Sequence, residues 1–246
     1  MSGHSKWSQI KRQKGVADVK RGATFTKAAN AITVAAREGG GGDPASNFKL
    51  RLVMEHARAV NMPKDIILRA IDRGLSKGLE GALDSVTYEG YGPGKVALVI
   101  EAVTDNKNRT TPEVKNVLEK SGGSFVTPGT VSWMFSDCGL ITLAKNGKSY
   151  DELFEAAVDA GADDVLDSDD AVEIYTKPNE LDKVKNALAE KGFAIQSAEL
   201  ARRATTTVEV SDPQTQKKIF DVLERLEDLD DVQKVWSNFE IIENPN

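Results

Sequence analysis

The spacing of apolar residues changes once along the chain, and this change constrains the fold more than any other feature. Between Asp18 and Gly74 apolar residues recur every three or four positions, the period of amphipathic helices. Beyond Ala82, short strand-like runs alternate with helical stretches. The sequence therefore predicts an α/β (α+β) fold, with an N-terminal three-helix domain followed by two ferredoxin-like α/β domains, one inserted in the other.

Three helices are expected after a flexible, basic arm at residues 1–15. The first runs from about Asp18 to Glu38 and ends at four glycines, 39–42. Its apolar face consists of Phe25, Ala28, Ala29, Ile32, Ala35 and Ala36. Asp43 and Pro44 are the expected start of the second helix. Pro63 opens the third, which we expect to stop at Gly74.

The next segment predicts a hairpin and a helix. Residues 86–91 and 96–103 are the expected strands, joined by a glycine-rich turn at 90–94. A helix is expected over 112–120, with a capping box from Thr110 and Glu113, or with Thr111 as the cap. Residues 131–135 are expected to form another strand.

The pattern from Gly139 onward predicts the order β-α-β-β-α-β of a ferredoxin-like domain. Its elements are expected at 139–144, 149–160, 163–167, 171–176, 180–191 and 193–200. A last strand-helix-strand unit is expected over 205–242. It can bury its apolar side only against the sheet predicted within residues 83–135. The expected domains are therefore a basic arm and helical domain at 1–80, a discontinuous α/β domain at 81–136 plus 204–246, and an inserted acidic domain at 137–203.

The net charge of −6 conceals a strong asymmetry. Residues 1–80 carry 15 Lys and Arg against 7 Asp and Glu, a net charge of +8, whereas residues 81–246 carry 17 against 31, a net charge of −14. The segment 137–203 alone has 8 against 15, a net charge of −7. A basic end on an acidic body predicts contact with nucleic acid at that end only.

The cations of the N-terminal segment are the candidate contacts, because Lys and Arg neutralise phosphates and release counterions. Within residues 1–37 the only acid is Asp18. The alternative is a solvated tail beside a solvated helix face. The residues expected to bind nucleic acid are Lys6, Trp7, Lys11, Arg12, Lys14, Lys20, Arg21, Lys27, Arg37 and Arg109.

Two of these residues have a second interpretation. The Trp7 indole can stack on an exposed base, or it can anchor the arm by burying its ring. Arg109, together with Lys107, can hold a phosphate at a helix start, or it can belong to a capped structural turn, which we favour. Arg69 and Arg73 can extend the basic surface, although cations that complement the dipole of the third helix are the simpler explanation.

No motif in the sequence specifies catalysis, a metal or a cofactor. The two histidines, His4 and His56, lie far apart, and the single cysteine, Cys138, excludes a disulfide framework. The turn that ends in Gly94 and Lys95 is followed by Val96 and a strand, so it is not a phosphate-binding loop. No run approaches the roughly 20 apolar residues of a membrane span, which predicts a cytoplasmic protein without a membrane partner.

Several motifs in order resemble the YebC/PmpR family almost from end to end. They are Gly3-His4-Ser5-Lys6-Trp7, Lys20-Arg21-Gly22 with Phe25 and Lys27, Tyr88-Glu89-Gly90-Tyr91-Gly92-Pro93-Gly94, Asp105-Asn106 through Asn108-Arg109-Thr110, and Ala160-Gly161-Ala162. The resemblance implies a three-domain, DNA-binding, probable transcriptional regulatory protein. It also implies kinship with mitochondrial translational activators and with bacterial members linked to the ribosome. The chain departs from the family pattern at Ala23, where a basic residue is usual, and at Lys95, where glycine is usual.

The leading hypothesis is a non-enzymatic regulator of gene expression that binds DNA. The alternative is a translation factor that contacts ribosomal RNA and the ribosome. A further alternative is an adaptor, in which the acidic domain binds a protein partner. The residues do not distinguish DNA from RNA, and no helix-turn-helix pattern rich in base-reading side chains is present.

Overall fold

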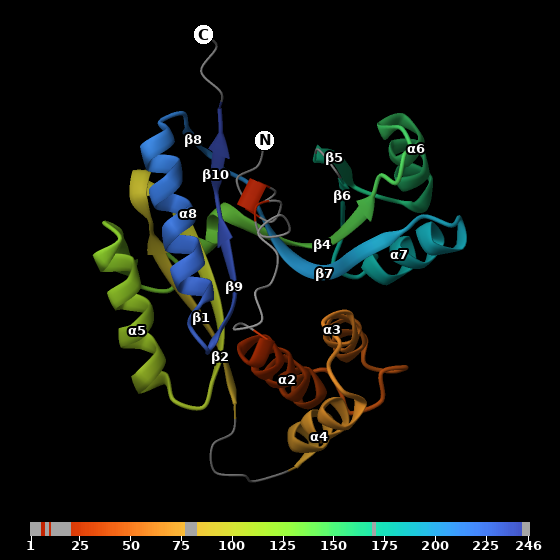
Figure 1. Cartoon of the computed structure of the whole chain (residues 1–246), viewed down its shortest axis with the longest axis horizontal. Helices are drawn as coiled ribbons and strands as arrows, with labels where there is room; N and C mark the ends of the chain where they lie inside the picture. The colour runs from red at the N-terminus through yellow and green to blue at the C-terminus, as the bar shows by residue number, and fades with distance from the viewer. Residues whose placement is uncertain (1–5, 8–9, 11–20, 77–82, 169–170, 243–246) are drawn as a thin grey trace. The chain divides into compact units, whose positions relative to one another are not determined.

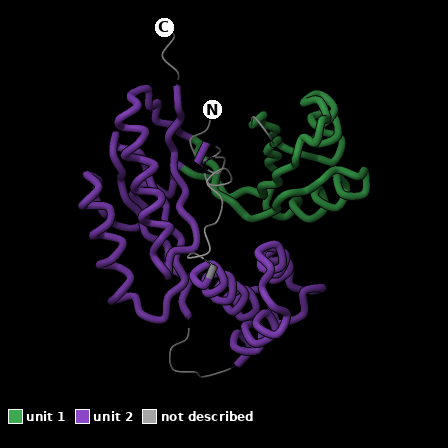
Figure 2. Tube along the Cα trace, viewed as in Figure 1, with its two compact units in different colours: residues 1, 135–205 green, residues 2–134, 206–246 purple. Residues whose placement is uncertain are grey.

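The computed structural model describes residues 6, 7, 10, 21–76, 83–168 and 171–242 (Figure 1). They form two compact units, one of residues 135–205 and one of the chain before and after that insertion (Figure 2). The α+β class predicted from the sequence is confirmed, with helices in the N-terminal part and sheets in the rest. The three-domain division remains a prediction.

Three helices pack together at the N-terminal end: α2 (Arg21–Glu38), α3 (Phe48–Ala59) and α4 (Lys64–Leu75). The predicted apolar face of α2 contributes to their core. Ile32 and Leu50 are fully buried there, and Ile67 and Ile71 of α4 pack against them. The 3.6-residue period therefore located this core correctly.

Two of the predicted helix boundaries were wrong. Helix α3 begins at Phe48, because the side chain of Asn47 caps it by accepting a hydrogen bond from the backbone N–H of Leu50 at 2.9 Å. Asp43 instead accepts from the backbone N–H of Ala45, at 2.9 Å, in the preceding turn. Gly74 does not stop α4 but lies within it, against the backbone of α2.

The larger unit contains an antiparallel sheet of order β3-β1-β2-β9. Helices α5 and α8 contact each other and pack on it (Figure 1). A short parallel pair, β8 with β10, completes this part. The elements are β1 (Asp84–Tyr91), β2 (Ala97–Thr104), α5 (Lys107–Lys120), β3 (Ser124–Val126), β8 (Val208–Val210), α8 (Pro213–Glu227), β9 (Val232–Ser237) and β10 (Phe239–Ile241).

The hydrophobic core of this unit lies between the sheet and helices α5 and α8. Alternate residues of β2 face it. Leu98 and Ile100 belong to the cluster that includes Val114 of α5 and Val222 of α8. Val103, on the other face of β2, packs with Leu83 and with Val34 of α2. The predicted hairpin is present, and its turn contains the short 3-10 helix Pro93–Lys95, in which Gly94 has φ +71°.

Three local predictions in this unit were wrong. Helix α5 begins at Lys107, five residues before the predicted start, and Asn106 caps it by accepting from the backbone N–H of Arg109. Residues 132–134 form a 3-10 helix where a strand was expected. The short strand β3 was not predicted, since it has only three residues and depends on pairing with β1.

The inserted unit has the predicted β-α-β-β-α-β order, and its antiparallel sheet has the strand order β5-β6-β4-β7. This is the ferredoxin-like arrangement. Its elements are β4 (Phe135–Ala144), α6 (Tyr150–Ala160), β5 (Asp164–Ser168), β6 (Ala171–Thr176), α7 (Leu181–Glu190) and β7 (Ile195–Ala204).

Candidate nucleic-acid interface

Trp7 joins the basic N-terminal segment, residues 1–37, to helix α8. Its side chain is only 3% exposed, and its ring stacks on Phe220 with the ring centroids 5.8 Å apart. The indole N–H donates a hydrogen bond to a carboxylate oxygen of Glu227 at 3.2 Å. Ile10 packs against the same core. The structure therefore places Trp7 as an anchor, the second of its two interpretations, and its ring is not exposed for stacking on a base.

Lys27 of α2 contacts the same C-terminal end of α8 as Trp7 does. Its ammonium group donates to the backbone carbonyl of Glu227, the last residue of that helix. The carbonyls at a helix C-terminus carry partial negative charge, so a lysine is favourable there. Trp7 and Lys27 thus connect two parts of the basic segment, one on each side of residues 11–20, to one place on the larger unit.

Besides Lys27 and Arg37, six cations of this segment were predicted to contact nucleic acid, and the structure describes few of them. Lys11, Arg12, Lys14 and Lys20 lie outside the described residues. Arg21 opens α2, and Lys6 is helical and half-buried next to Trp7. These cations lie in the sequence around the two anchored positions.

Arg37 is not brought together with Lys27. It lies ten residues further along α2, about 15 Å at the usual helical rise. Its guanidinium pairs with Glu38 at 3.0 Å. Arg37 lies in the last turn of α2.

The other helices of the N-terminal part carry exposed cations, of which Lys49, Arg58 and Lys64 were not predicted and Arg69 and Arg73 were considered above. Lys49 and Arg58 on α3 and Lys64 on α4 are exposed, as is Arg73. Arg69 pairs with Asp65 at 2.5 Å. Exposure depends on how the three helices pack, which the one-dimensional charge pattern does not show.

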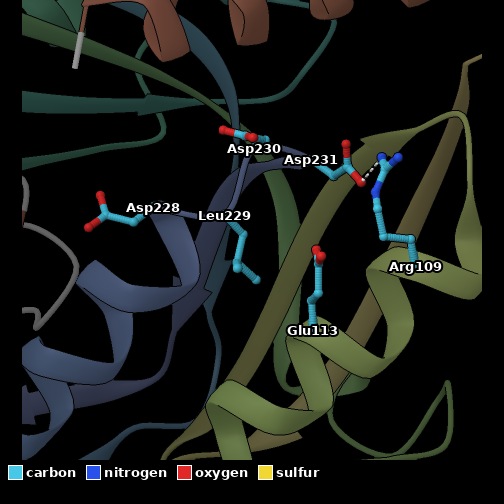
Figure 3. Close-up of a pocket in the computed structure, with 6 residues that line it drawn as sticks. All are labelled: Arg109, Glu113, Asp228, Leu229, Asp230 and Asp231. Atoms are coloured by element: carbon cyan, nitrogen blue, oxygen red, sulfur yellow. Dashed lines mark hydrogen bonds and ion pairs between the residues drawn. The ribbon is translucent and has the colours of Figure 1, made fainter. Parts of the chain in front are cut away.

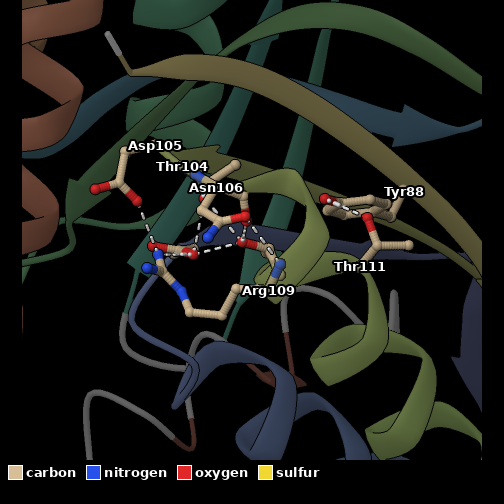
Figure 4. Close-up of polar contacts among 8 residues, drawn as sticks. Tyr88, Thr104, Asp105, Asn106, Arg109 and Thr111 are labelled. Atoms are coloured by element: carbon tan, nitrogen blue, oxygen red, sulfur yellow. Dashed lines mark hydrogen bonds and ion pairs between the residues drawn. The ribbon is translucent and has the colours of Figure 1, made fainter. Parts of the chain in front are cut away.

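Arg109 takes part in an intramolecular network (Figure 4). Its guanidinium lies 2.7 Å from Asp231 and 3.1 Å from Asp105. Asp231 also accepts hydrogen bonds from the hydroxyls of Thr104, at 3.0 Å, and Thr110, at 2.5 Å. Burial would raise the pKa of Asp231, but these three donors outweigh it and hold its pKa below the usual value. The structural-turn interpretation of Arg109 therefore fits its contacts.

A cavity of about 460 Å³ lies beside this network, between the start of α5 and the loop before β9 (Figure 3). Four of its six lining residues are acidic, and only Arg109 is basic; the others are Glu113, Asp228, Leu229, Asp230 and Asp231. So many carboxylates disfavour a phosphate. Within the described ranges, no group of three or more His, Cys, Asp and Glu could hold a metal ion.

The fold and charge distribution define a class: α+β proteins of two compact units, with a basic helical N-terminal part and an acidic inserted unit. This chain belongs to the TACO1/YebC family. A model of the TACO1/YebC protein N-terminal domain matches residues 5–77, and a model of the TACO1/YebC second and third domain matches residues 83–239. The family predicted from the sequence motifs is thus confirmed.

Relatives and a solved structure agree with this assignment. A probable transcriptional regulatory protein of Chloroflexus aurantiacus is 52% identical over 243 residues, covering 98% of this chain and 96% of that protein. A protein of the same description from Roseiflexus castenholzii is 53% identical over 245 residues, covering 98% and 96%. The crystal structure of a conserved hypothetical protein from Aquifex aeolicus matches with a TM-score of 0.85 and 42% identity, covering 92% of this chain and 93% of that one.

Among the described residues, no helix is long and apolar enough to cross a membrane.

Proposed function

We propose that this protein is a non-enzymatic, cytoplasmic regulator of gene expression that binds nucleic acid through its basic N-terminal segment. The names of its relatives, probable transcriptional regulatory proteins, support the regulatory role. DNA is the first target to test because those names point to transcription. Ribosomal RNA, bound on the ribosome by a translation factor, is the alternative.

The observation that carries the proposal is the anchored, one-sided basic segment. Residues 1–37 contain eight Lys and Arg and one acid, in a protein of net charge −6. Trp7 and Lys27 connect this segment to α8 on both sides of residues 11–20. An anchored cation cluster loses less freedom on binding than a free tail does, so more of its phosphate attraction appears as affinity.

The decisive experiment is ultraviolet crosslinking in cells, followed by purification of the protein and sequencing of all attached DNA and RNA. A variant with Lys11, Arg12, Lys20 and Arg21 changed to Glu is compared with the original chain. A matched control changes four exposed lysines elsewhere, Lys115, Lys120, Lys177 and Lys183, to Glu, which alters the net charge equally.

We expect specific crosslinks that the N-terminal variant loses and the control retains. Promoter DNA among them supports transcriptional regulation, whereas ribosomal RNA identifies a translation factor. Background levels of both nucleic acids with the original chain would reject nucleic-acid binding and leave the adaptor hypothesis for the acidic inserted unit. Loss of crosslinks in both variants alike would show that net charge, and not this segment, determines binding.

Affinity in vitro should also fall steeply with salt. Each phosphate neutralised on a duplex contributes about −0.9 to the slope of log affinity against log salt concentration. The N-terminal variant should therefore show a shallower slope than the original chain, measured by fluorescence anisotropy with a labelled duplex.

A further inference from the structure

Trp133 is the exposed tryptophan of an ordered loop, residues 127–134, that precedes β4. Its side chain is 65% exposed, whereas Trp7 and Trp236 are 3% and 2% exposed. Leaving a large aromatic ring in water forgoes the stabilisation that burial of its apolar surface would give. The ring is therefore presented to solvent, and the hydrogen bonds of the loop hold it there.

The buried carboxylate of Glu89 holds the loop. Glu89 is 3% exposed and accepts hydrogen bonds from the backbone N–H groups of Gly129, Val131 and Ser132, at 2.7, 2.6 and 3.1 Å. Burial would raise the pKa of Glu89, but these donors together lower it below the usual value, so the ionised form is favoured. Three charge-assisted bonds to one carboxylate fix the backbone on both sides of Val131.

The indole ring is fixed as well. Its N–H donates to the backbone carbonyl of Thr130 at 2.9 Å. The hydroxyl of Thr130 in turn donates to the carbonyl of Thr127 at 2.7 Å. Because the single polar group of the ring already has a partner, what remains for a ligand is the π-face and the apolar edge. The rotamer is ordered before binding, which lowers the entropic cost of a contact.

The surroundings of the ring favour a base over a protein. The exposed or half-exposed neighbours in the loop are Thr127, Pro128, Gly129, Thr130, Ser132 and Met134, and all of them except Met134 are small. A protein interface requires a contiguous patch of several hundred Å² with an apolar centre. Trp133 is the one large apolar side chain of residues 127–134 that is exposed, and a single flat ring of this kind matches one planar base, which stacks with little dependence on its identity.

We propose that Trp133 is a stacking platform for one unpaired base of a single-stranded nucleic acid. This proposal rests on the proposed function, because it assumes that the protein binds nucleic acid. It adds a second contact point, distinct in chemistry from the basic segment. The basic segment binds phosphates of any strand, whereas the Trp133 ring needs a base that is free of its partner.

The test uses the full-length protein with labelled single-stranded oligonucleotides of uridine or adenosine and with a blunt RNA duplex. The variants are Trp133→Ala and Trp133→Phe. The matched control is Leu68→Ala, which removes another exposed apolar side chain, 49% exposed, on α4. Thermal unfolding verifies that each variant is folded, and tryptophan emission of the original chain reports stacking directly.

We expect Trp133→Ala to weaken single-strand binding by about tenfold and duplex binding by less than twofold. Trp133→Phe should restore most of the loss, Leu68→Ala should change neither affinity, and single strands should quench the emission of the original chain but not that of Trp133→Ala. Equal affinities of Trp133→Ala and the original chain for single strands would reject the platform while leaving the proposed function intact. Absence of binding by the original chain to every strand tested would also reject the platform, whereas the proposed function, which includes DNA, is decided by the crosslinking experiment.

Discussion

Buried carboxylates hold two loops of the larger unit in place. Glu89 collects three backbone donors from residues 129–132, and Asp231 collects two threonine hydroxyls and the guanidinium of Arg109. A carboxylate removed from water is costly unless donors replace the lost solvent. Here every donor comes from a residue distant in sequence, so each carboxylate connects elements that local structure alone would leave apart.

Replacing Glu89 by Gln should destabilise the protein by about 1–3 kcal/mol, because an amide offers one acceptor oxygen and leaves buried backbone N–H groups without a partner. Urea unfolding followed by circular dichroism measures the change. The exposed Glu209, changed to Gln, is the control and should alter stability by less than about 0.5 kcal/mol. Equal midpoints for the two variants would contradict the role assigned to Glu89.

Stability should decrease in acid. The folded pKa values of Glu89 and Asp231 are both lowered, so the unfolded chain binds more protons than the folded chain as pH falls. Their contribution is complete above the unfolded pKa, about 4, and is lost as pH falls through the lower folded values. Urea unfolding between pH 7 and pH 3 measures this dependence. Asp231→Asn should show a weaker dependence on pH over that range, and an identical slope would contradict the assignment.

At the scale of elements, helices α2 and α4 approach closely at a glycine. A Cβ atom at Gly74 would lie 2.3 Å from the backbone oxygen of Thr33. The Thr33 hydroxyl donates to the carbonyls of Ala29, at 2.9 Å, and Ala70, at 3.0 Å. Glycine in a helix usually costs stability relative to alanine. In α4 its small size allows the crossing that buries Ile32 and Ile71.

Gly74→Ala should therefore destabilise the protein by about 1–3 kcal/mol, the usual cost of overpacking. The control is Gly22→Ala in the first turn of α2, where a Cβ atom would meet nothing within 4 Å. That change should stabilise by up to about 1 kcal/mol through helix propensity. Thermal unfolding of both variants tests whether Gly74→Ala lowers stability while Gly22→Ala raises it. A stabilising Gly74→Ala would refute the close approach of α2 and α4.

At the scale of the whole molecule, Trp7 near the N-terminus packs against α8, the last helix of the described residues. Trp7 and Phe220 stack, and the indole N–H reaches Glu227, 220 positions away. Lys27 meets the same residue through its carbonyl. The basic segment is thereby connected, through Trp7 and Lys27, to the part of the chain that follows the inserted unit.

Trp7→Ala should destabilise the larger unit by about 3–5 kcal/mol, because it removes a buried aromatic ring from the core. Trp133→Ala, a change of the same kind at an exposed position, should cost much less. Urea unfolding of the two variants provides the comparison. Trp7→Phe should recover part of the loss by preserving the stack on Phe220, and similar midpoints for Trp7→Ala and Trp133→Ala would refute the anchor.

The sequence by itself determined the features that depend on local periodicity and on composition. The apolar face of α2 and the β-α-β-β-α-β order of residues 135–204 follow from the spacing of apolar side chains, because one face of each element must be buried. Ordered motifs along the chain identified the family. Counting charges located the basic segment, although four of its cations lie outside the described residues.

Only the tertiary structure decided the features that depend on contacts between distant residues. Asn47 and Asn106 cap helices α3 and α5, for which other residues were predicted as caps. Several side chains in each loop can accept a hydrogen bond from a helix N-terminus, and tertiary packing selects one of them. Trp7 is buried while Trp133 is exposed, and the residue types around them do not distinguish these outcomes. Burial, close approach and the partner of a buried carboxylate depend on which segments the fold brings together, and the local sequence does not contain that information.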